Sequence, residues 1–273
     1  MSAREPDLST YVLAHGKSGR DRLRVLARIM EEGSINLIRR AGIPKGSKCL
    51  DVGSGGGDVT RLLANHVGPD GHVTGIDFDP IKVEMAARET SEAEIKNVEF
   101  RTASVFDLEP AQEFDVVIAR FVLSHLHDPI RALSRMHAAL RTGGQILVED
   151  VEFSAHFCYP PCDAMDDYIR IYTAMAASTG GDANIGPKLP GMLEKTGFRE
   201  ISMQVHQPAG LTGDVKMISP LTMHGMADRV VVEGLATRED VDRIETQLTA
   251  AAMDPGVSMS TPRVFQSRAR KVG

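Results

Sequence analysis

The chain has 273 residues and a formal net charge of −6, with 42% hydrophobic and 25% charged side chains. This composition is typical of globular proteins, and the acidic balance argues against a surface that binds nucleic acid or an anionic membrane, because such binding draws on clustered Lys and Arg. The three cysteines cannot all pair, the N-terminus lacks an apolar signal segment, and no apolar run reaches the roughly 20 residues of a membrane span, so we expect a cytoplasmic protein.

The first part of the chain, up to residue 44, is expected to form an N-terminal helical cap. Apolar residues at helical spacing predict two short helices over residues 18–42, and Ser34 is the expected N-cap of the second. From residue 48 the pattern alternates between strand and helix. The expected strands are 48–52, 72–77, 97–101, 114–119 and 145–150, and the expected helices are 58–67, 80–94 and 129–141. This alternation predicts a doubly wound parallel sheet with a ligand crevice at the carboxyl ends of its strands.

Beyond Asp150 the pattern becomes mostly helical. We expect helices at 163–178, 187–196, 214–235 and 238–252, and strands at 199–206 and 257–270. Thr237 and Asp240 resemble a capping box with Asp in place of Glu. We interpret residues 45–273 as one domain with helical lid insertions at about 151–180 and 212–255.

A glycine-rich turn follows the first predicted strand. Asp51 precedes glycines 53, 55 and 57 in the order D-x-G-x-G-x-G, and a helix is expected from Asp58. Glycine permits tight backbone geometry and close approach of a ligand, and the free N–H groups of a helix start favour negative charge. A dinucleotide fingerprint needs glycine at 58 or 60, where this chain has Asp and Thr, so the loop suits a ligand other than a pyrophosphate.

Later strand ends add further candidate ligand contacts. Asp77 stands 24 positions after Gly53, where a carboxylate can accept hydrogen bonds from both hydroxyls of a ribose. Ser104 follows the third strand, and Phe114–Arg120 forms the fourth. In this order the segments resemble the class I S-adenosylmethionine (SAM)-dependent methyltransferases over residues 45–150, in the small-molecule branch that resembles the ubiquinone and menaquinone biosynthesis enzymes.

The resemblance implies an α/β fold with a Rossmann-like seven-stranded sheet, mostly parallel, whose last strand is antiparallel. It also implies SAM as cofactor and S-adenosylhomocysteine as product. The candidate cofactor-binding residues are Asp51, Gly53, Ser54, Gly55, Gly57, Asp77, Phe78, Ser104, Val105 and Arg120.

The predicted function is methyl transfer from SAM to a small, apolar or aromatic molecule, with an O, N or C acceptor left open. Nine of the 13 methionines follow residue 150, and Met at helical spacing indicates either core or an adaptable apolar lining. Two alternatives remain open: a SAM-fold protein that binds cofactor without methyl transfer, as a structural partner or cyclase, and a macromolecular methyltransferase. The partner is expected to be the small substrate, without nucleic acid or membrane, and a homo-oligomer is left open.

No metal site is expected. Metal-dependent relatives have carboxylates after both the fourth and the fifth strand. This chain has only the second set, Glu149, Asp150 and Glu152, and we interpret these residues as pocket rim or solvated strand end. The C-x3-C pair Cys158 and Cys162 has no second pair nearby for zinc.

A histidine is the candidate general base, because its pKa is readily poised near neutral pH. His125 and His127 follow the fourth strand at the edge of the crevice, and His125 is the candidate catalytic residue. The alternative is that His125 packs or orients its loop. His156 and His224 are secondary candidates.

Overall fold

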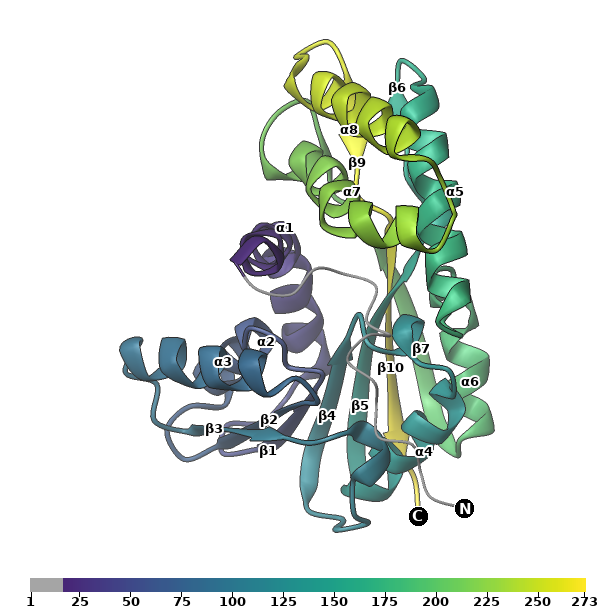
Figure 1. Ribbon diagram of the computed structural model, residues 1–273. Coiled ribbons are helices and arrows are strands. Elements are labelled where there is room, and N and C mark those ends of the chain that lie inside the picture. The colour runs from purple at the N-terminus through teal and green to yellow at the C-terminus, as the bar shows by residue number, and fades with distance from the viewer. Residues whose placement is uncertain (1–16) are drawn as a thin grey trace.

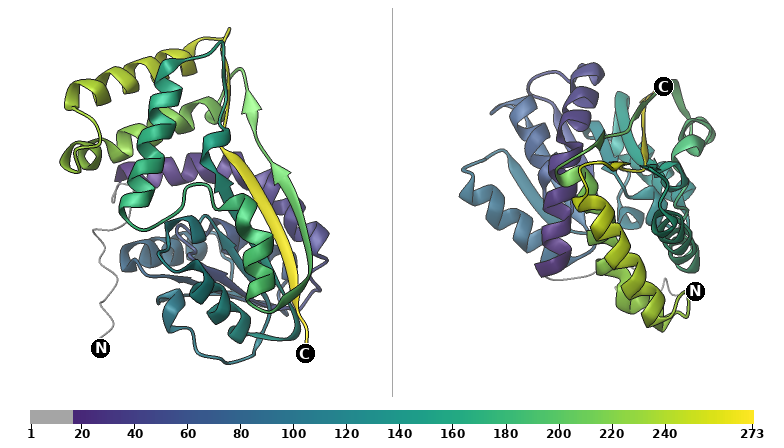
Figure 2. Two further views of the ribbon diagram at one scale, coloured as in Figure 1. Left: turned by 90° about the vertical axis from the view of Figure 1, so that its right-hand side faces the viewer. Right: turned by 90° about the horizontal axis from the view of Figure 1, so that it is seen from above.

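A seven-stranded sheet forms the base of the molecule (Figure 1). The computed structural model describes the backbone of residues 17–273 and the side chains of residues 22–273. In spatial order the strands are β3 (Val98–Thr102), β2 (His72–Asp77), β1 (Lys48–Val52), β4 (Phe114–Arg120), β5 (Leu140–Glu152), β10 (Arg263–Lys271) and β7 (Phe198–His206). Neighbours from β3 to β5 are parallel, and β10 runs antiparallel to both β5 and β7. Figure 2 shows β7 and β10 side by side along one edge.

Helices cover both faces of this sheet. The helices are α1 (Lys17–Ala41), α2 (Asp58–Val67), α3 (Pro80–Glu92), α4 (Pro129–Ala139), α5 (Asp163–Ser178), α6 (Leu189–Lys195), α7 (Asp214–Val232) and α8 (Arg238–Met253). Side chains of α1 and α2 share one core with β1 and β4, and α4 and α6 share another with the opposite face. Among the described helices, none is long and apolar enough to cross a bilayer.

The N-terminal segment contains one continuous helix where two were predicted. The prediction took Ser34 for an N-cap, but its side chain is fully buried inside α1, where Oγ donates to Oε1 of Glu149 at 2.8 Å. The hydroxyl therefore satisfies a strand side chain instead of capping a new helix. Gly33 is needed at this point because a Cβ there would lie 2.5 Å from the ring of His206.

A second tier stands above the carboxyl ends of the strands (Figure 1). It contains α7, α8, the first part of α5 and a small antiparallel sheet of β6 (Cys158–Tyr159), β9 (Ser258–Ser260) and β8 (Ala209–Gly210). Buried residues of α5, α7 and α8 form its core. We call this part the upper tier, and it lies where lid insertions were predicted.

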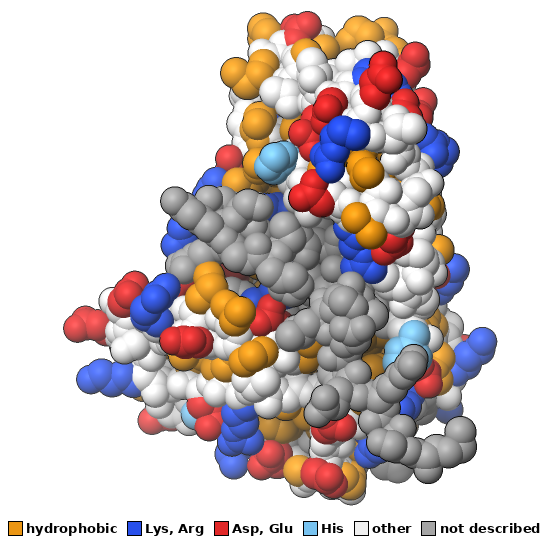
Figure 3. All heavy atoms as spheres, viewed as in Figure 1, with side chains coloured by type: hydrophobic (Ala, Val, Ile, Leu, Met, Phe, Trp, Pro, Cys, Tyr) orange, Lys and Arg blue, Asp and Glu red, His pale blue; other side chains and the backbone are white. Residues whose placement is uncertain are grey.

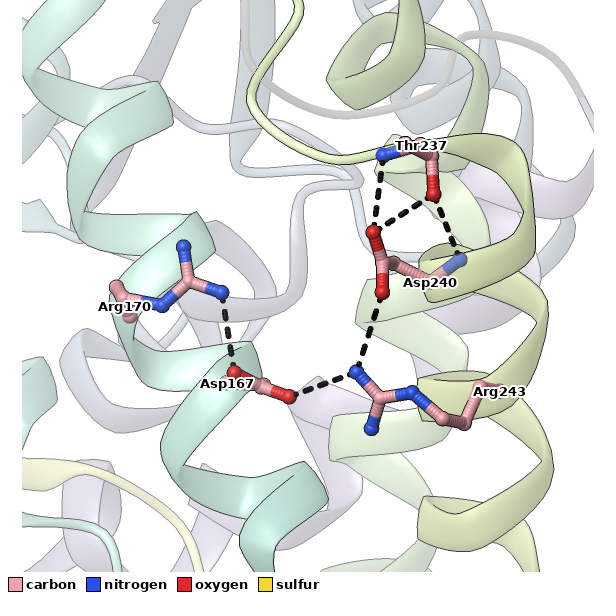
Figure 4. A network of polar contacts seen from close by, with 5 residues as sticks. All are labelled: Asp167, Arg170, Thr237, Asp240 and Arg243. Carbon is pink, nitrogen blue, oxygen red and sulfur yellow. Dashed lines mark hydrogen bonds and ion pairs between the residues drawn. The ribbon is translucent and has the colours of Figure 1, made fainter.

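Polar contacts join α5 and α8 on the outside of the upper tier (Figure 4). Asp167 accepts from Arg170 and from Arg243, each at 3.0 Å. The predicted capping box is present: the Thr237 hydroxyl accepts from the Asp240 backbone N–H, and the Asp240 carboxylate accepts from the Thr237 backbone N–H. Acidic and basic side chains intermingle over this face (Figure 3), and such exposed pairs add little stability.

Candidate active site

A cavity of about 1170 Å³ lies between the sheet and the upper tier. Its position at the carboxyl ends of β1, β2 and β4 is that expected for a doubly wound sheet. The predicted residues that line it are Asp51, Gly53, Ser54, Gly55, Asp77, Phe78, Ser104, Val105, Arg120, His125, His127 and His156. The sequence prediction therefore brought together residues from five separate segments. Gly57 is the one predicted cofactor residue that does not line the cavity.

The glycine loop is held against the end of β2. Backbone N–H groups of Gly53 and Ser54 both donate to the carbonyl of Ile76, at 2.8 and 2.9 Å. Gly53 has φ +70°, and a Cβ on it would come within 2.4 Å of Val122. A Cβ on Gly55, at φ +52°, would meet nothing nearer than 4.0 Å, so this position is open toward a ligand. The loop thus requires glycine for two reasons, packing at Gly53 and ligand approach at Gly55.

Gly57 serves the packing of helices rather than the cavity wall. It is the N-cap of α2 with φ +78°, and a Cβ there would lie 2.8 Å from the ring of Phe100 and 3.2 Å from Ala86. The structure therefore explains this glycine by the close approach of α2, α3 and β3.

Asp77 is placed to receive hydroxyl groups. One carboxylate oxygen accepts from the Gly55 N–H at 2.9 Å and the other from the Asp79 N–H at 3.0 Å. Each oxygen keeps a further lone pair, and the side chain is buried at the cavity wall. Ser104 also lines the cavity, and its Oγ accepts from the Phe106 N–H at 3.2 Å and caps a short 3₁₀ turn.

Asp51 places a buried carboxyl beneath the glycine loop. It accepts from the Thr60 hydroxyl at 2.6 Å. Burial raises the pKa of Asp51 from 3.8 to about 7, although Thr60 and the positive charge of Arg120 oppose the shift. Arg120 also donates to Ser34 at 3.1 Å, and the next residue, Phe121, has φ +57°. A bulky residue in the left-handed region is strained backbone, which is common where a chain lines a binding site.

Two of the three carboxylates in the last residues of β5, Glu149 and Asp150, are buried, so the prediction of a pocket rim or solvated strand end is wrong for these two. Glu149 accepts from Ser34 and from Gln266 at 2.9 Å, and Asp150 accepts from the Ser124 N–H at 3.0 Å. Both are essentially inaccessible because β10 and α1 cover β5. Among the described residues no cluster of three metal-ligating side chains occurs.

The three candidate histidines, His125, His156 and His224, differ in their exposure. His125 ends a short 3₁₀ turn after β4, and burial, with Arg22 and Lys82 nearby, lowers its pKa to about 4. Burial likewise lowers the pKa of His156 to about 4, and its Nδ1 lies 2.8 Å from the carbonyl of Phe153. His224 is exposed on α7, beside Glu245 and outside the cavity wall.

The other end of the cavity is aromatic and aliphatic, and we call it the aromatic end. Its described lining comes from α1, the segment after β5, α5 and α7: Arg22, Leu23, Leu26, Met30, Phe153, His156, Tyr168, Tyr172, Ile218 and Thr222. The rings of Phe153 and Tyr172 stack at 3.7 Å. Arg22, Ile218 and Thr222 could not be predicted from the sequence, because they belong to no motif. Met30 is the methionine in this wall, and the later Met residues at 165, 175, 223 and 226 are buried core.

The polar end fits a nucleoside-type cofactor. It offers the open Gly55 backbone, the Asp77 carboxylate and Ser54, whose buried Oγ has no hydrogen-bond partner among the described residues. A buried hydroxyl without a partner is costly, so a ligand that supplies one is favoured.

Residues 43–183 match the family described as methyltransferase domain, which is just over half of the chain. The chain belongs to this methyltransferase family. The predicted resemblance to class I SAM-dependent methyltransferases is thereby confirmed, as is SAM as the cofactor, and structures of the same fold have been solved with SAM and with S-adenosylhomocysteine.

Two relatives of this chain are named for chemically different substrates. It is 33% identical over 165 residues to an arsenite methyltransferase of Halobacterium salinarum, in a match that covers 60% of this chain and 40% of that protein. It is 32% identical over 128 residues to a demethylmenaquinone methyltransferase of Listeria monocytogenes, in a match that covers 43% of this chain and 54% of that protein. The chain thus spans about half the length of the curated relatives that it matches.

The fold extends beyond the part matched in sequence. A Bacillus halodurans structure described as that of a methyltransferase has a TM-score of 0.61 at 20% identity, covering 88% of this chain and 99% of that one. The predicted seven-stranded sheet, mostly parallel with its last strand antiparallel, is confirmed.

Proposed function

We propose that this methyltransferase transfers the methyl group of SAM to a small molecule with an aromatic or apolar body. The observation that carries the proposal is one continuous cavity with two chemically different ends. The polar end holds the glycine loop and Asp77, and the aromatic end is roofed by α1, α5 and α7. A cofactor and a ring-shaped acceptor can therefore lie together in one cavity.

At the polar end, the proposed contacts follow from the geometry. The free lone pairs of Asp77 accept the two ribose hydroxyls, and the open Gly55 backbone lets the cofactor approach. Asp51 supplies negative charge toward the amino group of the cofactor's amino-acid part. Bound SAM supplies an activated methyl group, so the remaining task of the chain is to position the acceptor and, where needed, to accept its proton.

His125 is the proposed proton acceptor for an O–H or N–H nucleophile. It lines the cavity, and its lowered pKa of about 4 leaves the ring unprotonated at neutral pH, as a base requires. The same low pKa makes His125 a weak base. The molecule that receives the methyl group must therefore carry an acidic proton of its own, as a phenol does.

An aromatic acceptor is favoured over arsenite by the position of the thiols. Soft metal and metalloid centres prefer thiolate ligands. Cys49 is buried in β1, and neither Cys158 nor Cys162 lines the cavity. The demethylmenaquinone methyltransferase relative, whose named substrate carries a ring, agrees better with stacked Phe153 and Tyr172.

The test has two stages. Isothermal titration with SAM and S-adenosylhomocysteine checks cofactor binding. If neither binds, the proposed methyl transfer from SAM is wrong. Release of S-adenosylhomocysteine with a panel of phenols, quinols, amines and sodium arsenite then checks transfer. Tight cofactor binding without turnover of any aromatic acceptor would instead favour a SAM-binding protein that transfers no methyl group.

A further inference from the structure

A single guanidinium stands out at the aromatic end of the cavity. Arg22, in the first turns of α1, lines the wall among aliphatic and aromatic side chains. The acidic residues of the described lining, Asp51, Asp58, Asp77 and Asp107, all belong to the polar end near β1, β2 and β3. Within the described part of the chain, no carboxylate forms an ion pair with Arg22.

The hydrogen bonds around Arg22 fix its orientation. The buried Thr222 hydroxyl donates to the carbonyl of Ile218 at 2.6 Å, so its oxygen is free to accept. Nε of Arg22 donates to that oxygen at 2.9 Å. The bond holds one edge of the planar guanidinium against α7, and no described residue bonds Nη1 or Nη2, so these groups can bind another partner. Those two groups form a fork that matches the two oxygens of a carboxylate.

The charge of Arg22 acts on the interior of the cavity. It contributes to the lowering of the His125 pKa, and it opposes the burial that raises the pKa of Tyr168 to about 12. The guanidinium therefore lies close enough to both rings to influence them. A cation in a mostly apolar chamber is costly unless a negative charge joins it, and bound SAM brings a further positive charge on sulfur.

We propose that the acceptor is an aromatic acid, and that Arg22 binds its carboxylate while the rings of Phe153, Tyr168 and Tyr172 enclose its body. This inference rests on the proposed function and narrows its substrate class. Arg22 would then be a specificity residue, selecting acids over neutral aromatics of the same shape. The carboxylate would also offset the positive charge that Arg22 and the sulfonium place in the same enclosure.

The experiment compares matched acids and amides. The probes are 1-hydroxy-2-naphthoate, 3-hydroxybenzoate and 4-hydroxycinnamate, each beside its primary amide, titrated calorimetrically into protein saturated with S-adenosylhomocysteine. We expect the protein to bind at least one acid about tenfold or more tighter than its amide, as a charged hydrogen-bonded pair permits. Arg22→Gln should abolish this preference without weakening amide binding, and Arg22→Lys should retain part of it.

Arg28→Gln is the matched control. Arg28 also lies on α1 and also bonds α7, through Asp214 at 2.6 Å, but it is exposed and outside the cavity wall. The Arg28→Gln variant should leave the preference for acids unchanged. The comparison thereby distinguishes the loss of a charge in the cavity from the loss of a contact between α1 and α7. Melting temperatures of all variants check folding.

Three outcomes would overturn the inference: equal binding of acids and amides, binding of none of the acids, or equal loss of acid and amide binding in Arg22→Gln. Because every titration begins with S-adenosylhomocysteine, the two proposals fail separately. Failure to bind S-adenosylhomocysteine contradicts the proposed function, whereas normal cofactor binding without selection for acids contradicts only the role of Arg22.

Discussion

The carboxylate of Asp77 accepts the backbone N–H of Gly55 at 2.9 Å, so the end of β2 fixes the loop that follows β1. Two motifs that are 22 residues apart in the chain thereby form one surface. The same carboxylate is the proposed acceptor for the cofactor ribose, which makes Asp77 both a scaffold for the loop and a ligand contact.

Asp77→Ala should weaken SAM binding by roughly 1–3 kcal/mol, because two ribose hydroxyls and the Gly55 N–H lose a charged acceptor. Asp77→Asn should lose less, since its amide oxygen still accepts one of these bonds. Gly55→Val should be worse than either, because it adds a branched side chain at φ +52° on the cavity wall. Calorimetric titration measures the three affinities, with exposed Asp70→Asn as control. Unchanged affinity in Asp77→Ala and Gly55→Val would mean that the cofactor lies elsewhere.

Asp51 should lower the stability of the ligand-free protein as pH rises. Its pKa is about 7 in the folded protein against an ordinary 3.8, so between these values the folded state holds more protons than the unfolded state. The free energy of unfolding therefore falls as pH rises from about 4 to 7. Asp51→Asn removes this penalty, and we expect its melting temperature to exceed that of the wild type more at pH 8 than at pH 5.

The same substitution should weaken SAM binding by about tenfold, because the cofactor's amino group loses a negatively charged partner. Melting curves at several pH values and a titration at pH 8 test both halves. A gain in melting temperature that does not vary with pH would show that ionisation of Asp51 is not its source.

The polar end of the cavity was predictable from sequence because its chemistry depends on local order. Glycines 53 and 55 and Asp77 occupy strand ends, and in a parallel sheet these ends meet at one edge. Ser34 was misread for the opposite reason. A Ser after Gly has the local pattern of a helix N-cap, and only the folded sheet shows that Glu149 needs the hydroxyl.

The aromatic end depends on contacts across long stretches of chain. Arg22 meets Thr222, 200 positions away, and neither residue belongs to a motif. The methionine-rich helices were expected to form either core or lining, and Met165, Met175, Met223 and Met226 proved to be core. Helical spacing reveals which face of a helix is apolar, but it does not distinguish packing against protein from packing against a ligand.

His125→Ala should reduce turnover by roughly two to four orders of magnitude with SAM affinity nearly intact, if His125 accepts the substrate proton. Because the pKa of His125 is about 4, the wild-type rate should rise with pH only below about pH 5 and stay level through neutral pH. Steady-state rates across pH, with an acceptor found by the turnover panel, measure both effects. His224→Ala, on the exposed face of α7, is the control. A modest loss of rate together with a lower melting temperature would identify His125 as a packing residue.

Lys216 should stabilise the upper tier more than any exposed charge on it. Its side chain is fully buried, and Nζ donates to the carbonyls of Leu211 at 3.1 Å, Asp254 at 2.5 Å and Val257 at 2.7 Å. One ammonium thus joins the approach to α7, the end of α8 and the approach to β9. Lys216→Met fills similar space but leaves these carbonyls without their charged donor, so we expect a loss of about 2–4 kcal/mol in the free energy of unfolding.

Arg243→Met provides the matched comparison, because it also removes a cation from the upper tier. Arg243 is exposed and pairs with Asp167 at 3.0 Å, so its loss should destabilise the protein much less than the loss of Lys216. Urea unfolding of the two variants and the wild type gives both differences under the same conditions. Equal effects would show that the three carbonyls find water or other donors when Lys216 is absent. A much larger loss in Lys216→Met would show that this buried ammonium holds α7, and with it one wall of the aromatic end, in place.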